Sequence, residues 1–231
     1  MPDFSKRCTE DELMDDFALS REIIDPIMDE LEVINLRLGG YSVFFNAFKK
    51  IGLKDQYSIS DWGCGGGDSL RQIAIWAKRK SINLQLSGLD ATPAAIDYAR
   101  RKAVARPEIS FELANVLTDD IQPNQYDVII SSLFTHHFRD ADWINLIKKM
   151  VASAKKAVVV NDLHRHWFAY YSIGFLTGLF SKSYMVKNDS KISVLRSFKK
   201  SELTSLLAEA GISNYQLRWM WAFRWQLIIY K

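Results

Sequence analysis

All four histidines of the sequence fall in two short segments, His136-His137 and His164-Arg165-His166. Imidazole titrates near neutral pH, so a histidine that faces a ligand can remove a proton from a phenol or an enol. His136 and His137 are therefore the candidate catalytic bases, unless they only hydrogen-bond the loop backbone. Imidazole also binds transition metals. No metal is expected here, because no matching cysteine set is present and adjacent histidines make joint ligation awkward.

A second segment, whose residue types could bind a ligand, spans residues 61–68 with the sequence Asp-Trp-Gly-Cys-Gly-Gly-Gly-Asp. Glycines let the backbone approach a ligand closely beside the N-terminus of a helix. A dinucleotide fingerprint would need a third glycine where Asp68 stands, and a P-loop would need Gly-Lys followed by Ser or Thr. An acidic residue at this point also repels a pyrophosphate. The loop is therefore predicted to bind a ligand without phosphates.

The elements that must position these residues follow an alternating pattern. Helical patterns separate short apolar stretches, which predicts an α/β fold with a doubly wound, mostly parallel sheet. A last helix and two closely spaced strands, which should pair as an antiparallel hairpin, complete seven strands. The predicted strands are residues 58–62, 84–89, 109–113, 126–133, 157–160, 215–220 and 223–230, and the helices are 69–80, 93–105, 140–153 and 198–210.

Two segments lie outside this pattern. Residues 1–50 predict an N-terminal helical segment that packs on the core, with a helix start at Thr9 and Glu12 in the reciprocal capping position. Residues 51–231 then form the main domain. Within it, the uncharged aromatic stretch 167–180 predicts a helical lid, which belongs to an insertion at residues 163–197.

The glycine segment, written Asp61-x-Gly63-x-Gly65-x-Gly67, resembles motif I of class I S-adenosylmethionine-dependent methyltransferases. That family places an acidic residue on the two ribose hydroxyls after the second strand, where Asp90 stands, and an Asp or Asn near the adenine after the third, where Asn115 stands. The resemblance implies a Rossmann-like fold and S-adenosylmethionine as cofactor, with S-adenosylhomocysteine as product. The residues it assigns to the cofactor are Asp61, Gly63, Gly65, Gly67, Asp90, Ala91, Asn115, Val116 and Ser131.

The arrangement as a whole is similar to a bacterial group of small-molecule methyltransferases, distantly related to ubiquinone and menaquinone methyltransferases. The similarity rests on Leu38-Gly39-Gly40, on the Ser-Ser-Leu-Phe-x-His-His loop at 131–137 and on Asn-Asp-Leu at 161–163. It implies an apolar acceptor, with the oxygen of a phenol, enol or quinol favoured over carbon. The predicted acceptor pocket consists of Asn35, Tyr41, Phe45, Asn161, His164, Trp167 and Tyr171.

Two other functions stay open at this level. Methylation of RNA or protein would call for an open cleft with a positive rim. A non-catalytic protein that binds S-adenosylmethionine would keep the cofactor motifs alone. The 30 Lys and Arg residues against 27 Asp and Glu leave a net charge of only +3, which does not favour a nucleic acid as partner.

Composition limits the number of domains and the cellular location that we expect. A chain of 231 residues with 48% hydrophobic residues has one main core. Two cysteines and a polar N-terminal stretch lead us to expect a cytoplasmic protein. The longest uncharged stretch is too short to span a bilayer, although weak contact of the aromatic stretch with a membrane surface is an alternative to the lid. The sequence does not indicate an oligomeric state.

Overall fold

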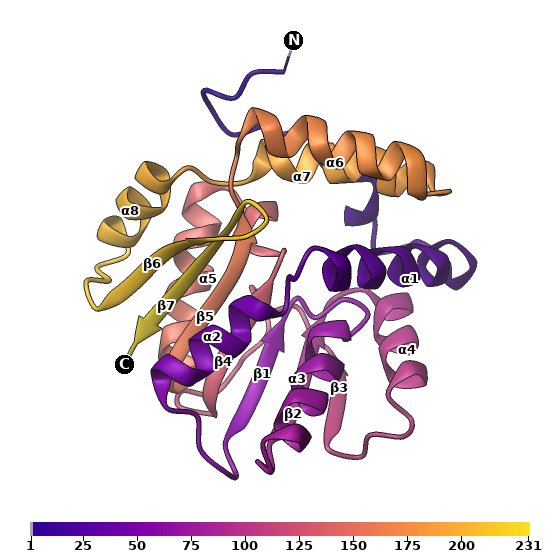
Figure 1. The fold of residues 1–231 in the computed structure, drawn as a ribbon. Coiled ribbons are helices and arrows are strands. Elements are labelled where there is room, and N and C mark those ends of the chain that lie inside the picture. Colours follow the sequence, from indigo (N-terminus) through magenta and orange to yellow (C-terminus); the bar gives the residue numbers. More distant parts are fainter. Residues whose placement is uncertain (1) are drawn as a thin grey trace.

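The computed structural model describes residues 2–231, and a seven-stranded sheet runs through its centre (Figure 1). The strand order is β3-β2-β1-β4-β5-β7-β6. The first five strands pair in parallel, whereas β7 runs antiparallel to both β5 and β6. The predicted fold class is confirmed, including the antiparallel hairpin. The strands are β1 (Ser58–Trp62), β2 (Gln85–Asp90), β3 (Ile109–Leu113), β4 (Tyr126–Ser132), β5 (Ala154–Leu163), β6 (Tyr215–Met220) and β7 (Arg224–Tyr230).

Helices cover both faces of the sheet, because successive buried side chains of a strand point to opposite faces. In β5, Val158 and Val160 belong to one core cluster and Val159 to the other. The first cluster includes side chains of α5 and α8, and the second includes those of α2, α3 and α4. These helices are α2 (Ser42–Ile51), α3 (Asp68–Arg79), α4 (Pro93–Lys102), α5 (Asp140–Ser153) and α8 (Lys200–Glu209).

The strand order reverses between β1 and β4, since β1 pairs with β2 on one side and with β4 on the other. In open α/β sheets, ligands bind at such a switch point, beyond the carboxyl ends of the strands. The carboxyl ends of the parallel strands point toward α1 (Arg21–Arg37), α6 (Trp167–Phe180) and α7 (Tyr184–Arg196) in Figure 1. The fold therefore brings both histidine loops and the glycine loop to one edge of the sheet.

Residues 2–20 differ from the predicted helix. Among them, only Leu13–Asp15 form a short 3-10 turn, η1, and the others are extended or irregular. Tertiary contacts hold it in place: the backbone N–H groups of Leu13 and Met14 each donate to the carboxylate of Asp189, both at 3.0 Å. Because that carboxylate on α7 satisfies two backbone donors, the segment gains little from forming a helix. Glu12 is the N-cap of η1, not a residue within a helix that begins at Thr9, and its carboxylate lies beside the histidine loop.

Residues 163–197, predicted as a lid insertion, contain two helices where the sequence indicated one. α6 carries the aromatic stretch, and α7 packs along it. Thr177 of α6 is buried, with its hydroxyl 3.5 Å from that of Ser190 on α7. Across residues 2–231, every helix is too short or too polar to cross a membrane.

Candidate active site

A cavity of about 800 Å³ lies beyond the carboxyl ends of the strands. Its floor is the glycine loop together with the residues that follow β2, β3 and β4. Its roof is formed by α1, the η1 segment, α6 and α7. Most of the wall is apolar, with Ile24, Met28, Leu31 and Leu176 among the lining residues. The polar groups gather in three places, which are the glycine loop, the start of β7 and the histidine loop.

The glycine loop takes a backbone path that side chains would obstruct. Gly63 has a φ of 73°, and a Cβ atom there would lie 2.2 Å from the ring of Phe134. Gly67 has a φ of 71°, and a Cβ atom there would lie 2.5 Å from the ring of Phe111. Gly63, Gly65 and Gly66 line the cavity, whereas Gly67 packs away from it. Gly67 therefore serves the close packing of the loop more than contact with a ligand.

Asp90, at the end of β2, lines the cavity beside this loop. One carboxylate oxygen accepts from the backbone N–H of Gly65 at 2.8 Å, and the other accepts from that of Thr92 at 2.9 Å. Each oxygen keeps a further lone pair. Asp90 thus fixes the shape of the loop and still offers acceptors to a ligand.

The other residues predicted to contact the cofactor divide into two groups. Ala91, Asn115 and Val116 line the cavity. Ser131 and Asp61 are buried outside it: the hydroxyl of Ser131 donates to the backbone carbonyl of Trp62 at 2.9 Å, and Ser132 lines the cavity in its place.

Asp61 lies below the loop, close to two other acids. Burial, and then the charges of Asp68 and Asp90, raise the pKa of Asp61 well above its usual value. Its Oδ1 atom is buried and has no hydrogen-bond partner within the described part of the chain. This concentration of carboxylates favours a cationic ligand over an anionic one.

Asn35 of α1 forms hydrogen bonds to both Asp68 and Arg224 at the cavity wall. Its amide donates to Asp68 at 3.2 Å, and its carbonyl oxygen accepts from the guanidinium of Arg224 at 3.2 Å. All three residues line the cavity. Tyr41, also predicted for the acceptor pocket, is buried and donates its hydroxyl to Asp68 at 2.7 Å. It acts through Asp68 and does not line the cavity.

Arg224, the first residue of β7, is only 2% exposed. Its Nε and Nη1 atoms have no hydrogen-bond partner among residues 2–231. Burial lowers the pKa of Arg224 to about 10, against the opposing effect of Asp162, Tyr41 and Asp68. A buried guanidinium with unpaired donors at a cavity wall is suited to an anionic group of a ligand. The sequence reasoning missed this residue because it assigned the terminal hairpin to the sheet alone.

α1 is also joined to the glycine loop. The guanidinium of Arg71 on α3 donates to the backbone carbonyl of Gly66 at 2.5 Å and pairs with Glu32 of α1 at 2.7 Å. Glu32 and Arg71 both line the cavity. The N-terminal helical segment therefore completes the site.

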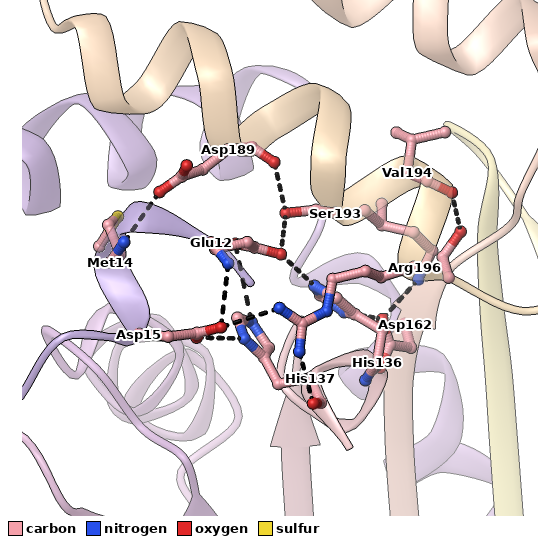
Figure 2. Close-up of polar contacts among 12 residues, drawn as sticks. Glu12, Met14, Asp15, His136, His137, Asp162, Asp189, Ser193, Val194 and Arg196 are labelled. Atoms are coloured by element: carbon pink, nitrogen blue, oxygen red, sulfur yellow. Dashed lines mark hydrogen bonds and ion pairs between the residues drawn. The ribbon is translucent and has the colours of Figure 1, made fainter. Parts of the chain in front are cut away.

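The histidine loop forms the third polar group (Figure 2). His136 is 2% exposed, and its Nδ1 lies 2.6 Å from Oδ1 of Asp162 on β5. The same carboxylate accepts from the hydroxyl of Thr135 at 2.6 Å and from the backbone N–H of His136 at 3.0 Å. On its other side, Nε2 of His136 lies 3.3 Å from Oε1 of Glu12. The ring is thus held between two carboxylates.

His137 is arranged in the same way. Its Nδ1 lies 2.7 Å from Oδ1 of Asp15, and its Nε2 lies 3.9 Å from Oε2 of Glu12. Arg196 of α7 secures this arrangement, because its guanidinium pairs with Asp15 at 2.8 Å and donates to the backbone carbonyl of His137 at 2.5 Å. Glu12, His136 and His137 all line the cavity.

The carboxylates set the charge of this group. Burial alone would lower the pKa of His136, but Asp162 and Glu12 outweigh it and raise the pKa to about 9. Burial opposes the charged form of Asp15 as well, yet the hydrogen bond from His137 lowers its pKa to about 2. His136 is therefore protonated at neutral pH in this arrangement, which does not suit it to accept a proton.

Of the residues predicted for the acceptor pocket, Asn35 lines the cavity and the others do not. Phe45 of α2 stacks on Trp76 of α3, with ring centroids 5.6 Å apart. The amide of Asn161 donates to the hydroxyl of Ser132 at 3.0 Å. Trp167 and Tyr171 are exposed on the outer face of α6. The inner face of that helix presents Phe168, Ala169, Ser172, Ile173 and Leu176 instead.

His164 and His166 do not join the other two histidines. They lie in a separate surface depression with Arg165 and Lys199. Burial and the positive charges of these neighbours lower the pKa of His164 to about 4. The clustering of four histidines in the sequence therefore corresponds to two distinct pairs in space.

Comparisons with known proteins agree with this geometry. Residues 59–157 match a family model described as a methyltransferase domain. The chain is similar to the plantazolicin methyltransferase BpumL in complex with S-adenosylhomocysteine, at 17% identity over 90% of this chain and 91% of that one, with a TM-score of 0.67. No curated protein matches the chain.

Two further solved structures share the fold. A SAM-dependent methyltransferase from Aquifex aeolicus is 14% identical over 80% of this chain and 87% of that one, with a TM-score of 0.58. Magnesium protoporphyrin IX methyltransferase from Synechocystis PCC 6803, with bound S-adenosylhomocysteine, is 15% identical over 84% of this chain and 82% of that one, with a TM-score of 0.56.

The family match and the fold define the class of protein. Residues 59–157 match a methyltransferase domain, and the architecture of the chain is the Rossmann-like fold of the class I S-adenosylmethionine-dependent methyltransferases. The expectation of a methyltransferase is confirmed. The distant likeness to ubiquinone and menaquinone methyltransferases stays a prediction.

Proposed function

We propose that the protein transfers the methyl group of S-adenosylmethionine to an oxygen of an apolar small molecule, such as a phenol, an enol or a quinol. The observation that carries the proposal is the cavity, one volume of about 800 Å³ that reaches from the glycine loop to the inner face of α6. A single cavity allows donor and acceptor to meet in line and away from water. The roof of α1, α6 and α7 favours a small acceptor over RNA or protein.

The floor of the cavity has the groups that the cofactor requires. The free lone pairs of Asp90 suit two vicinal ribose hydroxyls, and Asn115 and Val116 offer an edge for the adenine. When bound, S-adenosylmethionine supplies a methyl group on a cationic sulfonium. The carboxylates of Asp68 and Asp90 at the cavity wall stabilise such a cation, and this charge also explains why the loop is unsuited to phosphates.

The cluster of Asp68, Asn35 and Arg224 is complementary to an α-amino acid. The acid and the buried guanidinium, which keeps two donor atoms without a partner among the described residues, match an ammonium and a carboxylate on the same carbon. S-adenosylmethionine carries that zwitterion at its methionine end. We assign Asp68 to the ammonium and Arg224 to the carboxylate.

This assignment predicts that Arg224→Met loses affinity only for ligands that carry the amino-acid end. We expect the affinity for S-adenosylhomocysteine to fall at least about 10-fold, because a hydrogen bond to a charged group contributes about 1.5–3 kcal/mol. The affinity for 5′-methylthioadenosine, which lacks the amino-acid end, should stay within about twofold, since no contact is lost. Calorimetry with both ligands measures this. Arg218→Met, at an exposed position of β6, is the matched control. Equal losses for the two ligands would contradict the assignment.

The histidine loop receives the acceptor oxygen in this proposal. O-methylation needs an oxygen that has lost its proton or is losing it. Asp162 and Glu12, which face its two ring nitrogens, neutralise the charge of protonated His136. In this state His136 positions the loop and does not remove the proton as a base.

The proposal is tested by a screen of small phenols, quinols and pyrones with methyl-labelled S-adenosylmethionine. Ile173→Trp, on the inner face of α6, should raise the KM of an active acceptor about 10-fold because the larger ring occupies its space. Its affinity for S-adenosylhomocysteine should be unchanged. Phe175→Trp, on the exposed face, is the matched control. Activity on RNA or protein without activity on any small molecule would overturn the proposal.

A further inference from the structure

The two imidazoles of the histidine loop are oriented in the same unusual way. Each Nδ1 faces a carboxylate, Asp162 for His136 at 2.6 Å and Asp15 for His137 at 2.7 Å. Each Nε2 is thereby directed toward the carboxylate of Glu12, as Figure 2 shows. Histidines that bind metals almost always donate their other ring N–H to a carboxylate, a backbone carbonyl or a water, which fixes the ring and leaves one nitrogen for the ion.

The inner atoms of this cluster lack full hydrogen bonding. Nε2 of His136 is buried and makes no hydrogen bond of acceptable geometry to any residue from 2 to 231, although Oε1 of Glu12 is only 3.3 Å away. The ligand atoms of Glu12, His136 and His137 lie within 4.8 Å of one another. A buried polar atom without a partner, at the centre of three metal-binding side chains, calls for an additional group.

We infer that Glu12, His136 and His137 bind one divalent transition-metal cation of the Zn²⁺ type. The inference rests on the proposed function, because it assigns the cation to the acceptor end of the same cavity. Two histidines and one glutamate are a ligand set of catalytic zinc sites, which keep a fourth position open. Here that position faces the cavity, since all three residues line it.

The geometry needs a modest adjustment. Two atoms that each lie about 2.1 Å from one tetrahedral Zn²⁺ are about 3.4 Å apart. The ligand atoms, which lie within 4.8 Å of one another, therefore have to approach by up to about 1.4 Å. Adjacency of the histidines, which argued against a metal in the sequence, is no obstacle. The short 3-10 turn at Thr135–His137 places the two ring centroids 4.5 Å apart, with Glu12 from a distant segment beside them.

The cation gives the acceptor end a defined chemistry. The hydroxyl oxygen of the acceptor binds at the open position, and its proton leaves to solvent because the cation lowers the hydroxyl pKa. An electron pair of this oxygen then forms the bond to the methyl carbon. The carbon–sulfur bond breaks, and its electron pair stays on sulfur. Metal binding also displaces the proton of His136, so the metal ion and the proton compete for Nε2.

Cobalt titration of the full chain tests the site without any need for activity. Protein freed of metal by a chelator is titrated with Co²⁺ in mildly alkaline buffer, and the visible absorption of the ion is recorded. We expect about one Co²⁺ per chain, displaced by Zn²⁺, with a tetrahedral spectrum. Absence of binding by the unaltered chain would overturn the inference.

Variants locate the ion. His137→Ala is chosen because His137 is partly exposed and less important for packing than His136. It should weaken Co²⁺ binding by more than the 10- to 100-fold typical of a lost outer carboxylate, and Asp15→Asn should weaken it by about 10-fold. The double variant His164→Ala, His166→Ala should bind like the unaltered chain. Equal binding by His137→Ala and the unaltered chain would place the ion elsewhere and overturn the inference.

Calorimetry with S-adenosylhomocysteine on the same samples separates this inference from the function on which it rests. His137→Ala should bind S-adenosylhomocysteine normally, because the ring nitrogens of His137 face Asp15 and Glu12 and not the glycine loop. Failure of the unaltered chain to bind it, with Co²⁺ binding intact, would count against the proposed function and leave the metal site standing.

Discussion

Asp90→Ala is expected to weaken the binding of S-adenosylhomocysteine by about 100-fold, or ~2.7 kcal/mol. The carboxylate has two separate tasks. It accepts from the backbone of Gly65 and Thr92, which fixes the glycine loop, and its remaining lone pairs face the cavity. Alanine removes the ligand contacts and relaxes the loop at the same time, so the loss exceeds that of one hydrogen bond. Isothermal titration calorimetry measures it directly.

Asp97→Ala provides the matched control for this experiment, since the same change is made at an exposed position of α4. We expect its affinity to match that of the unaltered protein. The affinity of Asp90→Asn for S-adenosylhomocysteine should lie between those of Asp90→Ala and the unaltered protein, because the amide keeps one oxygen acceptor but presents a donor to Gly65 or to the ribose. An Asp90→Ala protein that is folded and binds within about threefold of normal would remove Asp90 from the cofactor site.

The sheet and the cofactor loop were predictable because their signals are local. β1, β3, α5 and β6 begin and end at the predicted residues. Each buried strand of a parallel sheet is a short apolar run between turns, and the glycine loop must follow the first of them. Gly63 illustrates the constraint, because Phe134 leaves no room for a side chain there.

The residues that sequence reasoning missed are those that only the tertiary fold assembles. Arg224 reaches the cavity because β7 lies beside β5 and begins at the carboxyl edge of the parallel strands. Glu12 reaches the histidine loop because Asp189 and Arg196 of α7 hold the N-terminal segment. One signal was present: Arg224 is the one charged residue of its strand, and a charged residue there requires either solvent or a ligand.

The orientation of α6 could not be read from its sequence. A helix without a charged residue over fourteen positions has no polar face to mark its outer side. Trp167 and Tyr171 were predicted to face the acceptor, yet the structure exposes both and turns Ile173 and Ser172 inward. Packing against α7 decides the rotation, and α7 itself was not predicted as a helix.

The buried carboxylate of Asp162 supports the second large prediction. It accepts from His136 Nδ1 at 2.6 Å, from Thr135 Oγ1 at 2.6 Å and from two backbone N–H groups. Asp162→Ala leaves these donors unpaired and the imidazole without its counter-ion. We expect the free energy of unfolding near pH 6 to fall by about 3–5 kcal/mol, measured by urea denaturation in the presence of a chelator so that the protein is free of metal.

The pH dependence of this loss distinguishes an ion pair from simple packing. The pKa of His136 is raised to about 9, so the folded protein keeps a proton that the unfolded chain releases near pH 6.5. Stability from the pair is complete below about pH 6.5 and declines up to about pH 9, by about 3 kcal/mol for this shift. Because the pKa of Asp162 is lowered, the same contribution is lost again in acid, below about pH 4. The difference between the unaltered protein and Asp162→Ala should therefore shrink as the pH rises from 6.5 to 9.

Asp127→Ala is the control that isolates the imidazole. Asp127, in β4, accepts from the backbone N–H and hydroxyl of Ser58 at 3.0 and 2.9 Å and has no histidine partner. Because the pKa of Asp127 is lowered, its contribution to the free energy of unfolding changes with pH only in acid. The loss of unfolding free energy in Asp127→Ala should therefore be constant from pH 6.5 to 9. A constant cost for Asp162→Ala over the same range would mean that His136 is neutral in the folded protein, and that Asp162 acts only as a hydrogen-bond acceptor.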